Sequence, residues 1–120
     1  MNRTTDIIEV IRQFKEDNQK KYSIITIGIF GSASRDSFND KSDIDVVVEL
    51  GNPDLFNLIG IKQDLEERFQ CPVDVVRYRE KMNGFLKRRI DQEAVYAWQE
   101  KVLAQAIKKI SEDIKEEDQN

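Results

Sequence analysis

Residues 31–45 read GSASRDSFNDKSDID, and this stretch decides the expected fold and chemistry of the chain. It begins with a Gly-Ser pair and ends with two carboxylates, Asp43 and Asp45, on either side of one isoleucine. The apolar, β-branched runs before and after it, residues 24–30 and 46–50, are typical of strands. Because side chains alternate along a strand, we expect Asp43 and Asp45 on the same face. The stretch therefore predicts a turn between two strands, with two acids facing one way.

Two carboxylates on one face repel each other unless they share a proton or hold a cation between them. The preceding Gly-Ser pair favours a cation such as Mg²⁺, which prefers oxygen ligands. Backbone N–H groups and a hydroxyl in a turn can bind phosphate, and glycine lets the phosphate approach closely. Each motif alone is more often an ordinary turn or a solvated strand end. Their combination between two strands predicts phosphoryl or nucleotidyl transfer.

The composition limits the other possibilities. The 120 residues fit one domain, and 39% hydrophobic with 35% charged residues is typical of a soluble globular protein. The chain has no histidine, which excludes Ser-His-Asp catalysis, histidine general bases and most zinc sites. No apolar run has the length of a membrane-spanning helix, and the N-terminus lacks a signal-peptide pattern. We therefore expect a cytoplasmic protein without a membrane partner.

Negative charge is concentrated at the C-terminal end of the sequence. Residues 111–120 contain five acids and one lysine, a net charge of −4 that equals the charge of the whole chain. The remaining residues are therefore close to neutral and lack the excess of basic side chains that nucleic-acid binding usually needs. We expect no direct nucleic-acid partner.

Apolar periodicity predicts the other elements of the domain. A first helix is expected around residues 7–14, and a second from Leu55 to about residue 70, with Asp54 as its N-cap. A strand over 73–78 carries Asp74 among apolar residues. Alone, Asp74 would be interpreted as an edge residue facing water, but together with the two earlier acids it is a candidate third metal ligand.

Two stretches nearer the C-terminus have roles that the sequence leaves open. Residues 80–98 are expected to form one or two helices that carry the basic cluster Lys87–Arg89. We interpret this cluster first as a solvated helix face, and second as a contact for triphosphate or for an acidic partner. Residues 99–120 are expected to form an amphipathic helix and an acidic tail beyond the domain of residues 1–98. This extension could dock a partner or a second copy, giving a hetero- or homo-oligomer.

The spacing of the central motif resembles a known signature. A Gly-Ser pair, ten further residues and then Asp-x-Asp is similar to the pattern of the polymerase-beta-like nucleotidyltransferase superfamily, and the short chain resembles its minimal nucleotidyltransferase (MNT) branch. Arg35, which follows Ser32 by three residues, and Asp74 match further positions of that pattern. The closing residues 90–96 are similar to the usual ending of the family.

The resemblance implies a fold and a site. The fold would be a small single-domain α/β nucleotidyltransferase fold, with a central mixed β-sheet and helices packed mainly on one side. Nucleotide-binding residues would be Gly31, Ser32 and Arg35. Catalytic and metal-binding residues would be Asp43, Asp45 and Asp74, which would hold Mg²⁺, expected as two ions, and Asp74 would also act as general base.

The same resemblance implies the reaction. AMP would be transferred from ATP to a hydroxyl, most specifically a tyrosine of a cognate HEPN-type ribonuclease toxin. The chain would be the antitoxin, because those toxins use an Arg and His motif and this chain has no histidine. One alternative is a non-catalytic antitoxin that masks its toxin by binding, although the full set of site residues disfavours it. Another is a nucleotidyltransferase for a small-molecule acceptor, which usually needs an additional domain.

Overall fold

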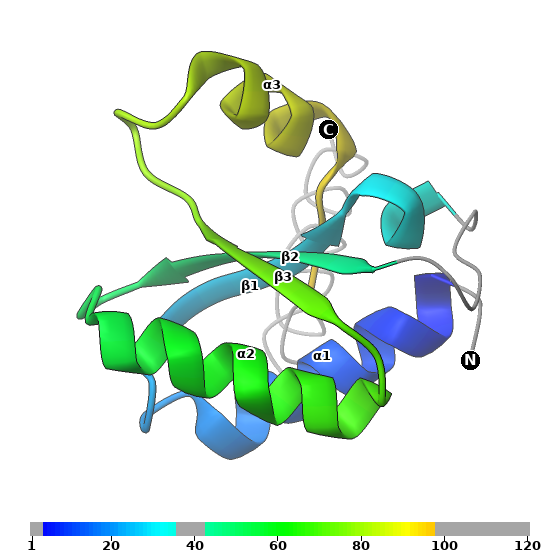
Figure 1. Cartoon of the computed structure of the whole chain (residues 1–120), viewed down its shortest axis with the longest axis vertical. Helices are drawn as coiled ribbons and strands as arrows, with labels where there is room; N and C mark the ends of the chain where they lie inside the picture. The colour runs from blue at the N-terminus through cyan, green and yellow to red at the C-terminus, as the bar shows by residue number, and fades with distance from the viewer. Residues whose placement is uncertain (1–3, 36–42, 98–120) are drawn as a thin grey trace, which may run out of the picture.

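A computed structural model describes residues 4–35 and 43–97 of the chain. These residues form a mixed sheet with helices on both of its faces (Figure 1). The elements in chain order are α1 (Thr4–Asn18), β1 (Ile24–Phe30), the 3-10 helix η1 (Gly31–Arg35), β2 (Ile44–Leu50), α2 (Leu55–Phe69), β3 (Val73–Arg77), α3 (Gly84–Glu93) and β4 (Val95–Tyr96).

The described sheet has four strands in the order β3-β2-β1-β4. β1 runs antiparallel to both β2 and β4, whereas β2 and β3 are parallel. A parallel pair cannot be joined by a tight turn, and α2 supplies the crossover between these two strands. The central position of β1 and β2 places the end of β1 and the start of β2 side by side.

Alternating side chains divide the core between the two faces of the sheet. On one face, Ile44, Val46 and Val48 of β2 pack in a buried cluster with apolar residues of α1 and α2. On the other, Phe30 and Val47 pack against Ile90 of α3. The predicted fold class is therefore confirmed: the sheet is mixed, and two of the three described helices cover one side, with α3 on the opposite side.

The second helix has the limits that its sequence predicts. Asp54 has extended backbone dihedral angles, and its carboxylate accepts a hydrogen bond from Phe56 N–H at 2.7 Å, which is N-cap geometry. Gln70 ends the helix in the left-handed conformation, with φ of 55°, and its N–H donates to Glu66 O at 2.8 Å. Both ends are thus fixed by local hydrogen bonds.

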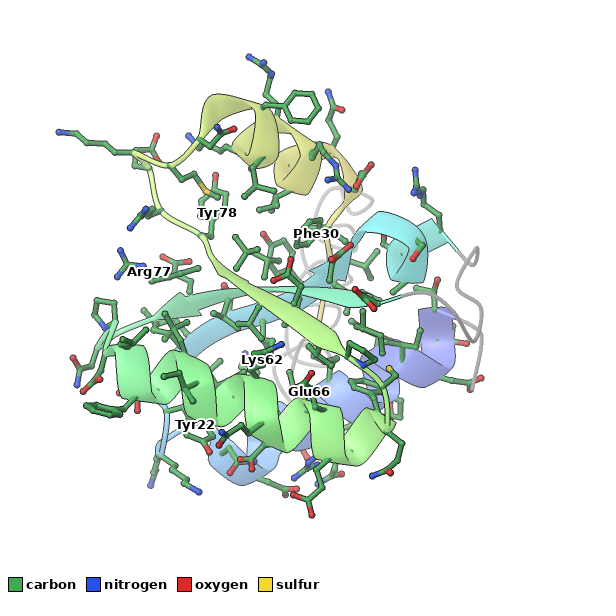
Figure 2. All side chains as sticks on the ribbon, viewed as in Figure 1. Tyr22, Phe30, Lys62, Glu66, Arg77 and Tyr78 are labelled. Atoms are coloured by element: carbon green, nitrogen blue, oxygen red, sulfur yellow. The ribbon has the colours of Figure 1, made fainter. Side chains whose placement is uncertain are left out.

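Side chains of α2 also bind the backbone of edge strand β3. Glu66 Oε2 accepts a hydrogen bond from Val73 N–H at 3.2 Å, and Lys62 Nζ donates to Val73 O at 2.5 Å. The same two side chains form an ion pair of 3.4 Å. Figure 2 shows Lys62 and Glu66 between α2 and β3. Both outward-facing backbone groups of Val73 are therefore satisfied by one helix.

Close contact between β1 and β4 requires a glycine at position 28. A Cβ on Gly28 would lie 2.7 Å from Val95 O and 2.9 Å from Tyr96 Cδ1. We expect Gly28→Ala to lower the free energy of unfolding by about 1–3 kcal/mol, because β4 must move away. Urea denaturation measures this change. Gly51→Ala is the matched control, since its Cβ would come no closer than 3.7 Å to other atoms; equal losses in both variants would contradict the prediction.

Two further predictions concern the C-terminal extension and membrane-spanning helices. The expected C-terminal helix and acidic tail, residues 99–120, lie outside the described residues, so the domain limit at residue 98 stays a prediction. Among the described helices, none combines the length and apolar character that crossing a membrane requires.

Candidate active site

The Gly-Ser pair forms the tight turn that the sequence predicts at the end of β1. Gly31 has φ of +69°, a left-handed conformation that favours glycine, and begins η1. Ser34 Oγ donates to Gly31 O at 2.7 Å, and Thr4 Oγ1 donates to Ala33 O at 2.6 Å. These bonds fix the turn internally and tie it to the start of α1.

The sheet register brings two of the three predicted acids together. Asp45 pairs with Phe30 of β1 on one side and with Asp74 of β3 on the other. Asp45 is half-buried, whereas Asp74 is exposed at the edge strand. Asp43 is exposed and directly precedes β2, which begins at Ile44, two residues before the run from Val46 that the sequence predicts as a strand. The common face expected for Asp43 and Asp45 stays a prediction. The carboxylates therefore come from adjacent strands and from the segment that enters one of them.

The turn and the acids belong to a single site. A Cβ on Gly31 would lie only 2.5 Å from Asp45 Oδ2, so the carboxylate of Asp45 fills the space beside the glycine. A side chain at position 31 and this position of Asp45 are mutually exclusive. The Gly-Ser motif and the Asp-x-Asp motif, separated in sequence, are thus in contact in the fold.

Electrostatics at Asp45 fit a cation. Burial raises the pKa of the Asp45 carboxyl above its usual range, and the negative charge of Asp74 raises it further, whereas Arg89 lowers it. Asp43 and Glu93 also raise this pKa. A carboxylate whose ionisation is disfavoured by burial and by neighbouring acids is suited to a hard divalent ion such as Mg²⁺. Within residues 4–35 and 43–97, no three acidic side chains already surround a common point as metal ligands do.

Helix α3 adds two charged residues: Arg89, from the basic cluster whose second interpretation is a contact for triphosphate, and Glu93, which was not among the predicted site residues. Glu93 Oε2 accepts a hydrogen bond from Gly31 N–H at 3.1 Å. Arg89 Nη2 lies 3.6 Å from the same oxygen, and Arg35 Nη1 lies 3.7 Å from Glu93 Oε1. Arg89 also stacks over the ring of Phe30, with its Cζ 5.7 Å from the ring centroid. One carboxylate therefore joins the turn to two guanidinium groups.

The three basic residues of the cluster on α3 lie in different environments. Arg88 is exposed, as the first interpretation of the cluster expects, and Lys87 pairs with Glu80 at 3.2 Å. Arg89 instead turns toward the site. The signal for it was present in the sequence, since Arg89 and Glu93 are oppositely charged residues four positions apart on a helix. The sequence did not indicate which face of the sheet α3 packs against.

The structure thus places each predicted site residue. It brings Gly31, Asp45 and Asp74 together, with Asp43 near enough to influence Asp45 electrostatically. Ser32 is half-buried in the turn, and Arg35 is exposed and directed to Glu93. The chemical roles given to these six residues stay predictions.

Known proteins resemble this chain in sequence. The family model described as "Nucleotidyltransferase domain" matches residues 11–97. A relative from Methanocaldococcus jannaschii, named "Putative protein adenylyltransferase", is 30% identical over 97 residues, which cover 80% of this chain and 99% of the relative.

Solved structures resemble it in fold. A crystal structure of a toxin-antitoxin with AMP-PNP has a TM-score of 0.64 and 21% identity, covering 93% of this chain and 92% of that chain. A structure of the tri-AMPylated Shewanella oneidensis HEPN toxin in complex with MNT antitoxin has a TM-score of 0.60 and 22% identity, covering 97% of this chain and 92% of that chain. At these identities the likeness concerns the fold.

Proposed function

We propose a function for this chain on the premise that it belongs to the nucleotidyltransferase domain family, whose model matches residues 11–97. The chain is a nucleotidyltransferase, and we propose that it moves AMP from ATP to a hydroxyl group of a protein. The observation that carries this proposal is the contact between the turn and the acids: Asp45 Oδ2 lies against Gly31, and Asp74 lies beside Asp45 in register.

In the proposed reaction, the acceptor oxygen attacks the α-phosphorus of ATP. The bond from that phosphorus to the bridging oxygen breaks, and pyrophosphate leaves. The N–H groups of the turn and the Ser32 hydroxyl bind phosphate oxygens, and Arg35 adds a positive charge on the same side. Asp74, exposed at the edge strand and so open to an acceptor, takes the hydroxyl proton.

The acids would hold magnesium. Asp43, Asp45 and Asp74 offer only carboxylate oxygens, the ligand type that Mg²⁺ prefers, and their mutual repulsion would be relieved by the ion. Bound there, Mg²⁺ would supply positive charge for the triphosphate and lower the pKa of the attacking hydroxyl. The role of the chain is to keep these oxygens next to the phosphate-binding turn.

The acceptor that we propose is a tyrosine hydroxyl of a HEPN-type ribonuclease toxin, so that this chain acts as the antitoxin. Support comes from a relative named as a protein adenylyltransferase and from the fold shared with a structure that contains an AMPylated HEPN toxin and an MNT antitoxin. A bulky protein acceptor is compatible with the exposure of Asp43 and Asp74.

Intact mass spectrometry tests the proposal. The purified chain is incubated with ATP, Mg²⁺ and the protein encoded beside it in the genome, and the masses of both proteins are measured. We expect the partner to gain one or more adenylate units. A stable complex without a mass gain would instead identify an antitoxin that masks its toxin, and neither complex nor gain would indicate a small-molecule acceptor.

A further inference from the structure

We propose that Glu93 and a phosphate of the bound nucleotide compete for the same donors, so that Glu93 must leave Gly31 when the nucleotide binds. This inference rests on the proposed function, because it assumes that a triphosphate binds at the turn. It adds a residue of α3 that controls the strength of that binding.

The donors around Glu93 are those that phosphates take in proteins. Its carboxylate contacts a backbone N–H in a glycine turn, at 3.1 Å, and two guanidinium groups, at 3.6 and 3.7 Å. Turn N–H groups and arginine forks are also the recurrent ligands of phosphate oxygens. The Glu93 carboxylate therefore occupies a position that would also suit a phosphate group of the nucleotide.

The two anions cannot share these donors. Gly31 has a single N–H, and at φ of +69° the turn directs it to Glu93 Oε2. A phosphate bound at the turn needs that hydrogen, and it also meets the charges of Asp45 and Asp74. A third carboxylate held at 3.1 Å from the same nitrogen would add repulsion between like charges. Movement of Glu93 removes this repulsion and releases both arginines.

The arginines differ in how they can respond. The Arg35 side chain is 59% exposed, so it can reorient toward phosphate at little cost. Arg89 is held over Phe30 and stays beside the turn, with Nη2 3.7 Å from the position that a Gly31 Cβ would take. Once Glu93 has moved, Arg89 is a preplaced cation for the phosphate.

Affinity measurements on Glu93→Gln test the competition. The probe is an ATP analogue with a methylene group in place of the α–β bridging oxygen, which binds with Mg²⁺ but cannot transfer AMP. Because glutamine keeps the size of the side chain and removes its charge, we expect Kd for the analogue to fall by about fivefold or more. Isothermal titration calorimetry gives Kd for the wild type and the variant. Asp91→Asn is the matched control: it removes the same charge from the same helix, keeps an acceptor for the hydroxyl of Tyr78, and should leave Kd unchanged.

An NMR titration of the wild type tests the displacement without a substitution. The backbone amide signal of Gly31 and the side-chain carboxylate carbon of Glu93 should both shift as the analogue binds. Two results would show that the inference is wrong: the analogue binds but the Glu93 carboxylate signal does not move, or Glu93→Gln weakens binding. In either case Glu93 holds the two arginines in place and is not displaced, and the proposed function still stands. If the wild type and the variant both fail to bind the analogue, the proposed function itself fails, and the inference with it.

Discussion

Replacement of Asp43 and Asp45 together by asparagine is expected to reduce AMP transfer by about a thousandfold or more, close to the limit of detection. Loss of metal ligands removes several kcal/mol of transition-state stabilisation, and each 1.4 kcal/mol corresponds to about tenfold in rate. The intact-mass assay, run as a time course, gives the rates. Glu49→Gln is the matched control, because Glu49 is an exposed acid on the same strand, four residues beyond Asp45. Unchanged turnover in the double variant would show that the metal site lies elsewhere.

Asp45→Asn alone should make the protein more stable at neutral pH. Burial, and then Asp74, raise the pKa of the folded-state Asp45 carboxyl, so the folded protein binds this proton more tightly than the unfolded chain. Stability is therefore lost as the pH rises from the ordinary aspartate range through the raised pKa. Asp45→Asn avoids this loss, so its melting temperature should exceed that of the wild type at pH 7, with the difference shrinking below about pH 4. A lower melting temperature at pH 7 would contradict the predicted repulsion.

Gly31→Ala is expected to give the second largest loss, in both activity and stability. The left-handed conformation costs a non-glycine residue about 1–2 kcal/mol, and the new Cβ would lie 2.5 Å from Asp45 Oδ2. The carboxylate must then move, and a displaced catalytic group of this kind costs about a hundredfold in rate. Steady-state rates and urea denaturation measure the two effects.

Gly84→Ala is the control for this glycine. Position 84 begins α3, and nothing lies within 4 Å of its Cβ position. Alanine there should leave activity unchanged and stabilise the helix by about 0.5–1 kcal/mol. If Gly31→Ala also left activity unchanged and stabilised the protein, activity would not depend on the left-handed turn or on the contact between Gly31 and Asp45.

Much of the fold could be predicted because its signals are local. The strands β1 and β2 are runs of β-branched residues, and the start of α2 is set by the N-cap residue Asp54. The Gly-Ser and Asp-x-Asp motifs made Asp45 a candidate site residue, and Asp74 became one only in combination with them. The predicted strand run began at Val46, whereas β2 begins at Ile44, because a strand boundary depends on its partner strand: Ile44 N–H donates to Pro72 O, and this pairing starts β2.

The part that could not be predicted depends on tertiary contacts. Charge spacing on α3 shows that Arg89 and Glu93 can pair, but not that Ile90 packs on Phe30 and turns this pair toward Gly31. A basic cluster on a short helix is most often solvated, so the general expectation pointed away from the site. Only the packing of α3 across the second face of the sheet decides that one of the three basic residues lies next to Asp45.

The hydrogen bonds from α2 to Val73 have a consequence for the alignment of the strands. A shift of β3 by one residue along β2 would turn every side chain of β3 to the other face and move Asp74 away from Asp45. Such a shift would also break both bonds to Val73, because Glu66 binds the N–H and Lys62 the carbonyl of that residue. Helix α2 therefore resists sliding of the edge strand β3 along β2. Strands at open sheet edges often slip in register during folding. Here the slip is opposed at Val73, the residue next to the Asp74 that the proposed reaction requires.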